Sequence, residues 1–262
     1  MRESLRLLCV CVVLYGCNAL AQNPAQPSRE PQAVAILEQA YAVSSDLPAA
    51  DLHGSVVHAR VRGRDESTST AIVIKTRGRA IRTESPADTS LTTHGRSNHR
   101  DNSGVAWKDA PDPNAGHRHA DHLPAYLLAE FLLRTDVALS YVGVEQIDGR
   151  PTHHVRAVPF VNFPEGTDPE FIRQHLANAT TDLYIDADTL LLTQVTFTQV
   201  SVTDWRRGAL VTIRYSDYRT LGGLKVPARQ TRHFAGQLAW ELTLDSVERN
   251  TGLPSSDFTG RQ

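Results

Sequence analysis

Once its first residues are set aside, the 262-residue chain has neither cysteine nor methionine. Its three cysteines are Cys9, Cys11 and Cys17, and Met1 is its single methionine. A chain cleaved after Ala21 would keep none of them, so no disulfide could stabilise the fold and no thiolate could act as nucleophile or metal ligand. Stability must then come from a hydrophobic core, and about 230 residues suffice for one large domain.

Blocks of basic residues are missing as well. The chain has 27 Lys and Arg against 29 Asp and Glu, a formal net charge of -2. This balance argues against a nucleic-acid partner, because phosphate binding needs concentrated Lys and Arg. After the N-terminal segment, no apolar run approaches transmembrane length, so we expect no transmembrane span in the mature chain.

The first residues have the pattern of an export signal. "MRESLR" supplies positive charge, "LLCVCVVLYGC" is a short apolar run, and "ALA" is a small-residue cleavage site, so residues 1–21 are predicted to be a signal peptide. Alternatively "LYGC" (Leu14–Cys17) is a lipobox, with cleavage and lipidation at Cys17. We therefore expect a periplasmic or secreted protein, or a lipoprotein anchored to the membrane through Cys17. The polar, proline-rich residues 22–32 predict a flexible linker.

Hydrophobic periodicity divides the remaining residues, 33–259, into three helices and about ten strands. The helices are predicted from "QAVAILEQAYAVSS" (32–45), "LPAYLLAEFLLRTD" (123–136) and "DPEFIRQHLANA" (168–179), the last with Asp168 as N-cap. The strands alternate with period two and are joined by short turns, as antiparallel hairpins require. Residues 97–122 are polar, and we expect a long loop there with one short strand at "VAWK" (105–108). The pattern predicts a mainly β, α+β domain in which helices pack on one side of an antiparallel sheet.

The stretch "GHRHADHL" spells the metal-binding signature of the metallo-β-lactamase superfamily. The residues concerned are His117, His119, Asp121 and His122. A metal-dependent hydrolase is therefore one hypothesis. However, "DAPDPNAG" precedes the signature and cannot form the buried strand that would present such ligands. We interpret the stretch as a chance pattern in a chain with 11 histidines. No other grouping forms a convincing active site, so we expect no enzyme, no metal and no cofactor.

Three later stretches resemble one protein family in the order in which they occur. They are "YVGVEQIDGRPTHHVRAV", "TDLYIDADTLLLTQVTF" and "VTIRYSDYRTLGGLKVPARQTRHFAGQLAWELTLDSVERNTGL". Within them, the Asp-x-x-Thr-x-Leu phrase of Asp186–Leu191, the strand–turn–strand of Tyr215–Pro227 and the closing Asp245–Asn250 are similar to the periplasmic outer-membrane lipoprotein carrier and lipoprotein-sorting family. The resemblance covers roughly residues 140–258. It is closer to uncharacterised secreted relatives than to the carrier itself.

The resemblance implies a LolA-like fold over residues 33–259. This is a curved, incomplete antiparallel β-barrel whose concave face is covered by helices, and the apolar hollow between them accepts acyl chains. The chain departs from the family in its long polar 97–122 segment, and no carrier-specific ligand residue can be matched.

We therefore expect an exported, monomeric, non-catalytic binding protein of the cell envelope that carries or senses lipids, lipoproteins or another apolar ligand. The alternative is a protein–protein interaction or stress-sensor domain with an envelope protein as its partner. An apolar cavity would bind its guest through burial of apolar surface, at about 25 cal/mol per Å². The predicted lining residues are Ile72, Ile74, Tyr126, Phe131, Phe197, Ile213, Tyr215, Trp240 and Leu242. For each of them, ordinary core packing between sheet and helix is the alternative.

Overall fold

A single antiparallel sheet dominates the structure, a computed structural model that describes residues 27–93, 96–101, 108–111, 123–201, 204 and 206–259. The strands are β1 (Gly54–Gly63), β2 (Thr70–Arg77), β3 (Ala80–Glu84), β4 (Asp88–Thr93), β5 (Arg96–Asp101), β6 (Lys108–Pro111), β7 (Val137–Ile147), β8 (Arg150–Pro159), β9 (Thr181–Asp186), β10 (Leu192–Val200), β11 (Gly208–Leu221), β12 (Leu224–Phe234) and β13 (Gln237–Arg249). Their order is β6-β5-β4-β3-β2-β1-β13-β12-β11-β10-β9-β8-β7. The sheet does not close, because β6 and β7 lie at its opposite ends.

In the described part of the chain, three α-helices accompany the sheet at the positions predicted from the sequence: α1 (Pro31–Ser44), α2 (Pro124–Leu133) and α3 (Pro169–Ala179). Two short 3₁₀ helices, η1 (Ala49–Asp51) and η3 (Ser255–Phe258), are also present. Asp168 is the predicted N-cap of α3, since its carboxylate accepts a hydrogen bond from the N–H of Glu170 at 3.0 Å. Among the residues described, no helix is long and apolar enough to span a membrane.

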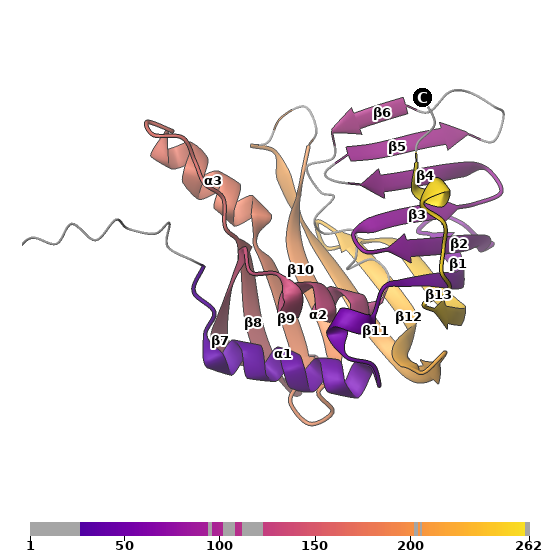
Figure 1. Cartoon of the computed structure of the whole chain (residues 1–262), viewed down its shortest axis with the longest axis horizontal. Helices are drawn as coiled ribbons and strands as arrows, with labels where there is room; N and C mark the ends of the chain where they lie inside the picture. The colour runs from indigo at the N-terminus through magenta and orange to yellow at the C-terminus, as the bar shows by residue number, and fades with distance from the viewer. Residues whose placement is uncertain are drawn as a thin grey trace, which may run out of the picture.

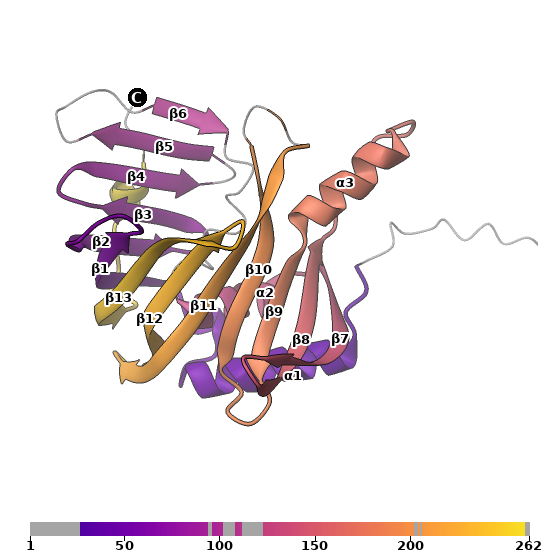
Figure 2. The same cartoon turned by 180° about the vertical axis from the view of Figure 1, so that it is seen from behind.

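The sheet is strongly bent. In Figures 1 and 2, β7–β12 stand upright while β1–β6 lie across the view, so the two wings enclose a concave face. Irregular pairing, as between β1 and β13 and between β12 and β13, accompanies the bend, because bulges increase the local twist of a strand. Helices α1 and α2 lie on the concave face, where they contact each other and β12. The expected incomplete barrel with helices on its concave face is therefore confirmed.

Helix α3 is placed differently from α1 and α2. It contacts β8 and β10 and projects from the end of the sheet in Figure 1, and none of its residues is buried. Its side chains therefore add little to the main core.

Alternation along the strands builds the core. Val211, Ile213 and Tyr215 on β11 are 0%, 0% and 5% exposed, and they face the same side because successive residues of a strand point to opposite faces. From the helical side, Leu37 of α1 and Leu127 of α2 are also fully or nearly fully buried. The core thus lies between the concave face of the sheet and the two helices.

The expectation of a long loop over residues 97–122 is wrong in part. Residues Arg96–Asp101 form β5, which pairs with β4, and Lys108–Pro111 form β6, which pairs with β5. These segments lack the apolar alternation by which a strand is predicted. They still form strands, because main-chain pairing with a neighbouring edge needs no apolar side chains. Among the residues described, the sheet therefore has thirteen strands instead of about ten. Of the strand expected at 105–108 only Lys108 is described, and residues 112–122 lie outside the described residues.

The flexible linker expected over residues 22–32 also needs correction. Residues 1–26, with the predicted signal peptide and lipobox, lie outside the described residues, but the chain is already docked at Ser28. The N–H of Leu139 donates to the carbonyl of Ser28 at 3.0 Å, and the N–H of Glu30 donates to the carbonyl of Leu139 at 2.9 Å. Arg29 thus forms a parallel bridge with Leu139 on the outer edge of β7, and α1 begins at Pro31.

Candidate functional site

The nine side chains predicted to line a cavity lie in one hydrophobic cluster. They come from β2 (Ile72, Ile74), α2 (Tyr126, Phe131), β10 (Phe197), β11 (Ile213, Tyr215) and β13 (Trp240, Leu242). Eight of them are no more than 8% exposed, and Trp240 is partly buried against the others. The structure therefore brings all nine together at the interface of sheet and helices. Their role in holding a ligand stays a prediction.

Arg232 brings a positive charge to this apolar face. On β12 it lies opposite Ile213 of β11 and opposite Trp240 of β13, so it shares their face of the sheet. Its guanidinium carbon is 5.6 Å from the ring centroid of Phe197, and its Nη2 donates to Oε1 of Gln199 at 2.6 Å. Sequence reasoning missed this residue. Only the strand register, which the sequence does not give, places it beside the predicted cluster.

On its concave side, β12 becomes more exposed over its last residues. Val226 and Gln230 are 0% exposed, Arg232 is partly buried, and Phe234 is 43% exposed. Arg232 thus lies where the closed interior gives way to solvent at the rim.

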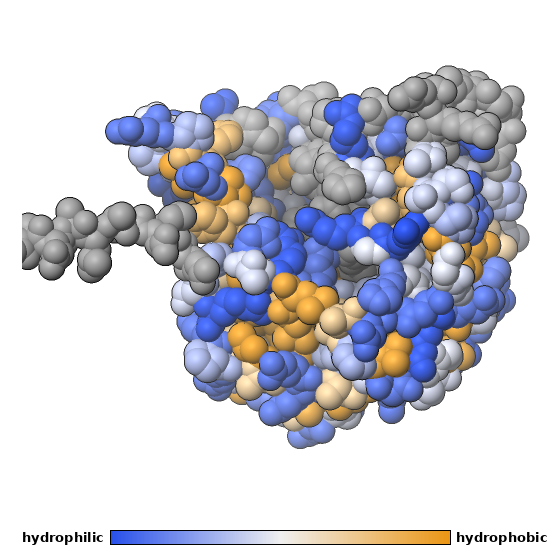
Figure 3. Space-filling view, viewed as in Figure 1, coloured by the Kyte–Doolittle hydropathy of each residue, from blue (hydrophilic) through white to orange (hydrophobic). Residues whose placement is uncertain are grey.

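A hollow of about 840 Å³ lies between α1, the C-terminal end of α2 and the segment that follows α1. Its apolar lining includes Val34 and Tyr41 of α1, Leu47, and Leu132 and Leu133 of α2. Leu133 is 55% exposed. Figure 3 shows hydrophobic residues gathered on the side of the molecule that α1 crosses, with polar residues around them. This groove is an apolar opening between the two covering helices.

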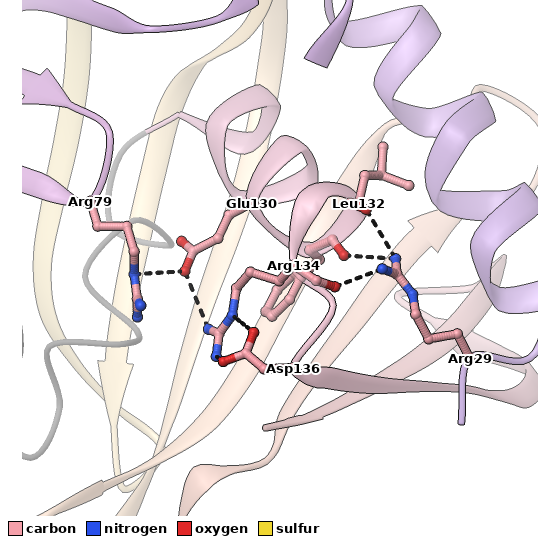
Figure 4. Close-up of polar contacts among 7 residues, drawn as sticks. Arg29, Arg79, Glu130, Leu132, Arg134 and Asp136 are labelled. Carbon is pink, nitrogen blue, oxygen red and sulfur yellow. Dashed lines mark hydrogen bonds and ion pairs between the residues drawn. The ribbon is translucent and has the colours of Figure 1, made fainter. Parts of the chain in front are cut away.

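Arg29 holds the end of α2 beside this groove. Its guanidinium donates to the main-chain oxygens of Phe131, Leu132 and Arg134 at 2.9, 3.2 and 2.6 Å (Figure 4). The last carbonyls of a helix have no partner within the helix, and the helix dipole makes this end negative. Arg29 therefore supplies both the missing donors and the favourable charge.

The other side of the α2 terminus is held by ion pairs. Glu130, whose side chain is 8% exposed, lies 3.3 Å from Arg79 in the β2–β3 turn and 3.3 Å from Arg134. Arg134 in turn donates to Asp136 at 2.8 Å, and this bond lowers the pKa of the Asp136 carboxyl. With Arg29 on the β7 edge and Arg79 on the other wing, α2 connects the two wings of the sheet.

Tyr126 anchors the opposite end of α2. Its hydroxyl donates to the carbonyl of Gly54, at the start of β1, at 2.6 Å, and the residue is 8% exposed. Burial raises the pKa of Tyr126 to about 12, so the phenol stays protonated and remains a donor over the physiological range.

On the opposite face of the sheet, His154 of β8 is bonded at both ring nitrogens. Nδ1 lies 2.6 Å from Glu145 and Nε2 lies 2.8 Å from Asp182, while the ring stacks on Tyr184 at 4.6 Å. With both nitrogens engaged and only 4% of the residue exposed, His154 presents no lone pair to a metal or a substrate. It is a structural group that links β7, β8 and β9.

The metal-binding hypothesis concerned His117, His119, Asp121 and His122, and all four lie outside the described residues. Within the described ranges, no group of three or more His, Cys, Asp or Glu side chains could hold a metal ion.

Comparison with protein-family models and with curated protein sequences finds no match to this chain. Solved structures do match its fold. A domain named for outer-membrane lipoprotein sorting, from Vibrio parahaemolyticus, aligns with a TM-score of 0.55 and 15% identity over 87% of this chain and 96% of that chain. A LolA superfamily protein from Nitrosomonas europaea aligns with a TM-score of 0.51 and 16% identity over 87% and 97%. A DUF1329 family protein from Desulfovibrio piger aligns with a TM-score of 0.54 and 9% identity over 88% and 98%. At these identities the likeness concerns the fold alone, and that fold is LolA-like.

Proposed function

We propose that this chain is an exported, non-catalytic binding protein of the cell envelope, which holds an apolar ligand such as an acyl chain of a lipid or lipoprotein. One observation carries the proposal. The apolar concave face is covered by two helices that leave an apolar groove of about 840 Å³ between them. We place the ligand in this groove, whose lining includes none of the nine predicted residues. The export signal read from residues 1–21 supports a periplasmic or secreted location, or attachment through Cys17.

The affinity of such a site should depend on chain length. Each buried methylene contributes about 0.8 kcal/mol, so removing one methylene should weaken binding roughly fourfold. Twelve buried methylenes would contribute about 10 kcal/mol, against an association cost of about 4 kcal/mol or more. Chains of this length should therefore bind with dissociation constants no tighter than about 40 μM.

The test is a competition titration of the mature protein with straight-chain alcohols of increasing length against a fluorescent fatty-acid probe. Leu133→Asp places a charge in the groove and should weaken binding at least tenfold. The matched control is Leu210→Asp, because Leu210 is 57% exposed, like Leu133 at 55%, but lies on β11 away from the groove. If the wild-type protein takes up no probe and carries no lipid when purified from its own envelope, the proposal is wrong.

A protein partner is the second candidate, and the edge of β7 favours it. Val142 and Val144 are 48% and 55% exposed there, beyond the point where Ser28–Glu30 covers the edge. An uncovered strand edge can pair with an added strand of another chain. A photocrosslinker at Val144 in intact cells should then give one dominant protein adduct, whereas a diffuse pattern of adducts would count against this candidate.

A further inference from the structure

The outer face of the sheet, opposite the face that α1 and α2 cover, carries two rows of polar side chains. Figure 2 views this face, with the two helices behind the strands. In the first row, the register places side by side Gln194 of β10, Arg214 of β11, Thr231 of β12, Glu241 of β13 and Arg62 of β1. The second row consists of Ser216, Arg229, Thr243 and Arg60. Arg214 follows the buried Ile213, so both rows point away from the core.

Two hollows lie along these rows and share Glu241. The larger hollow, of about 520 Å³, is lined by the residues of both rows that lie on β10–β12 and by Glu241. The smaller, of about 240 Å³, is lined by Glu241 and by the residues of both rows on β13 and β1. The rows therefore form the floor of one polar trough. Since adjacent strands lie about 4.8 Å apart, the trough extends roughly 19 Å from β10 to β1.

Connections between strands wall the trough at both ends. At one end, Nη1 of Arg214 lies 3.4 Å from Asp148 in the β7–β8 turn, although β9 and β10 separate β8 from β11 in the sheet. The tip of the β7–β8 hairpin must therefore fold over the outer face, and the register shift next to Gly143 accompanies this fold. At the other end, Ser67 and Ser69 of the β1–β2 connection line the smaller hollow.

The charges along the trough nearly cancel. Its four row arginines each pair with a carboxylate, and 49–53% of each arginine side chain stays exposed. Glu241 lies between two of them, 2.6 Å from Arg229 and 3.5 Å from Arg62, while Arg60 pairs with Asp245 at 2.8 Å. A polyanion would therefore meet little net positive charge, and the carboxylates would repel it. The trough suits an uncharged ligand better.

The mixture of donors and acceptors narrows the class of ligand. Guanidinium groups only donate hydrogen bonds, carboxylates only accept them, and the hydroxyl groups of Ser216, Thr231 and Thr243 do both. Neighbouring hydroxyl groups of a sugar also donate and accept, so they match such a surface. An acyl chain would cover these polar groups without pairing them, at a cost in free energy. An extended peptide pairs with a strand edge, and β10–β1 all lie inside the sheet.

We propose that this trough is a second binding site, which holds an uncharged glycan chain of several sugar rings. The two polar rows bind its hydroxyl groups, and the β7–β8 hairpin and the β1–β2 connection limit its ends. The site lies on the face opposite the apolar groove between α1 and α2. The inference therefore does not rest on the proposed function, and the two ligands can be bound at the same time.

The experiment titrates the mature protein with four probes and follows its amide NMR signals. Two probes are uncharged tetrasaccharides, chitotetraose and maltotetraose; the others are the monosaccharide N-acetylglucosamine and the polyanion dextran sulfate. At least one tetrasaccharide should shift the signals of β11, β12 and β13 and bind at least tenfold more tightly than the monosaccharide. A chain contacts several residues of the rows at once, whereas a single ring contacts only a few.

Variants of the first row test the assignment. Arg214→Met removes a charged donor and should weaken tetrasaccharide binding about tenfold or more, and Thr231→Val removes one hydroxyl group and should weaken it about two- to tenfold. The matched control is Arg156→Met. Arg156 lies on the same face, on β8, with 44% of its side chain exposed and a pair with Asp182 at 2.8 Å, but it lines neither hollow. Its loss should leave glycan binding unchanged, and urea unfolding midpoints would verify that all variants are folded.

The outcomes separate this inference from the proposed function. Absence of tetrasaccharide binding, equal affinity for tetrasaccharide and monosaccharide, tighter binding of dextran sulfate than of either tetrasaccharide, or unchanged affinity in Arg214→Met overturns the inference. None of these results affects the apolar groove, which the titration with straight-chain alcohols tests separately. The comparison of probes on the wild type needs no variant, so it decides the matter even if Arg214→Met does not fold.

Discussion

Replacing Arg29 with methionine should loosen the end of α2 and lower the stability of the whole domain. The substitution keeps the length of the side chain and removes the guanidinium, which donates to the main-chain oxygens of Phe131, Leu132 and Arg134 at 2.9, 3.2 and 2.6 Å. Hydrogen bonds from a charged group contribute roughly 1.5–3 kcal/mol, and a cation at a helix C-terminus adds about 0.3–1 kcal/mol. Water can reach these partly buried carbonyls after the change. We therefore expect the free energy of unfolding to fall by about 2–3 kcal/mol.

Urea unfolding followed by tryptophan fluorescence measures this loss. The midpoint should move to lower urea with an unchanged slope, and the melting temperature should fall by about 5–10 °C, at about 2–4 °C per kcal/mol for a domain of this size. Arg29→Lys should lie between wild type and Arg29→Met, because a compact ammonium cannot fork to three carbonyls.

The control for Arg29 is Arg173→Met on α3, where the arginine side chain is 73% exposed. It should change stability by no more than about 0.5 kcal/mol. If Arg29→Met unfolds at the same urea concentration as the wild type, the contact with α2 contributes nothing to stability and the reasoning is refuted.

Three further changes test the interior. Tyr126→Phe should cost about 1 kcal/mol near neutral pH, because the carbonyl of Gly54 loses its donor. The wild type should also lose stability as the pH rises from 10.0 to about 12, since the phenol of Tyr126 ionises first in the unfolded state. Unfolding measured at increasing alkaline pH should show that the phenylalanine variant lacks this loss of stability. Ile213→Ala should cost about 2–5 kcal/mol in urea unfolding, because the residue is 0% exposed and leaves a cavity. Burial of the Asp186 carboxylate would raise its pKa, but hydrogen bonds from Thr189 lower the pKa below 3.8. The wild type should therefore lose stability as the pH falls below that value. The stability of Asp186→Asn should decline less steeply in acid.

The helices could be predicted closely because their signals are local. Asp168 and Pro169 mark the start of α3 through capping and through the fixed backbone angle of proline, and both act within one turn. The segment "RSNHRD" of β5 gives no such signal. It becomes a strand because β4 offers it an edge, so its structure depends on where the rest of the chain has folded.

The candidate site shows the same limit. Alternation on β11 identified Ile213 and Tyr215 as inward-facing, but it could not place Arg232 beside them, because the pairing of β11 with β12 sets that neighbourhood. The contact of Arg29 with the end of α2 joins residues 105 positions apart, and no pattern within either segment announces it. The apolar positions that face the core can therefore be predicted from the sequence alone. The positions of the polar residues around the site depend on the strand register, which the sequence does not give.

An open sheet makes these polar contacts more important than they would be in a closed barrel. In the described part of the chain, the strand order does not join β6 to β7, so sheet hydrogen bonds link the two wings only through β1, β13 and β12. Helix α2 spans that opening, with Arg29 at the β7 edge on one side and the Arg79–Glu130 pair at the β2–β3 turn on the other. The position of α2 also sets the width of the groove, because Leu132 and Leu133 form part of its wall. Arg29, which holds the end of α2 by hydrogen bonds, therefore also lies in the lining of the groove in which we place the ligand.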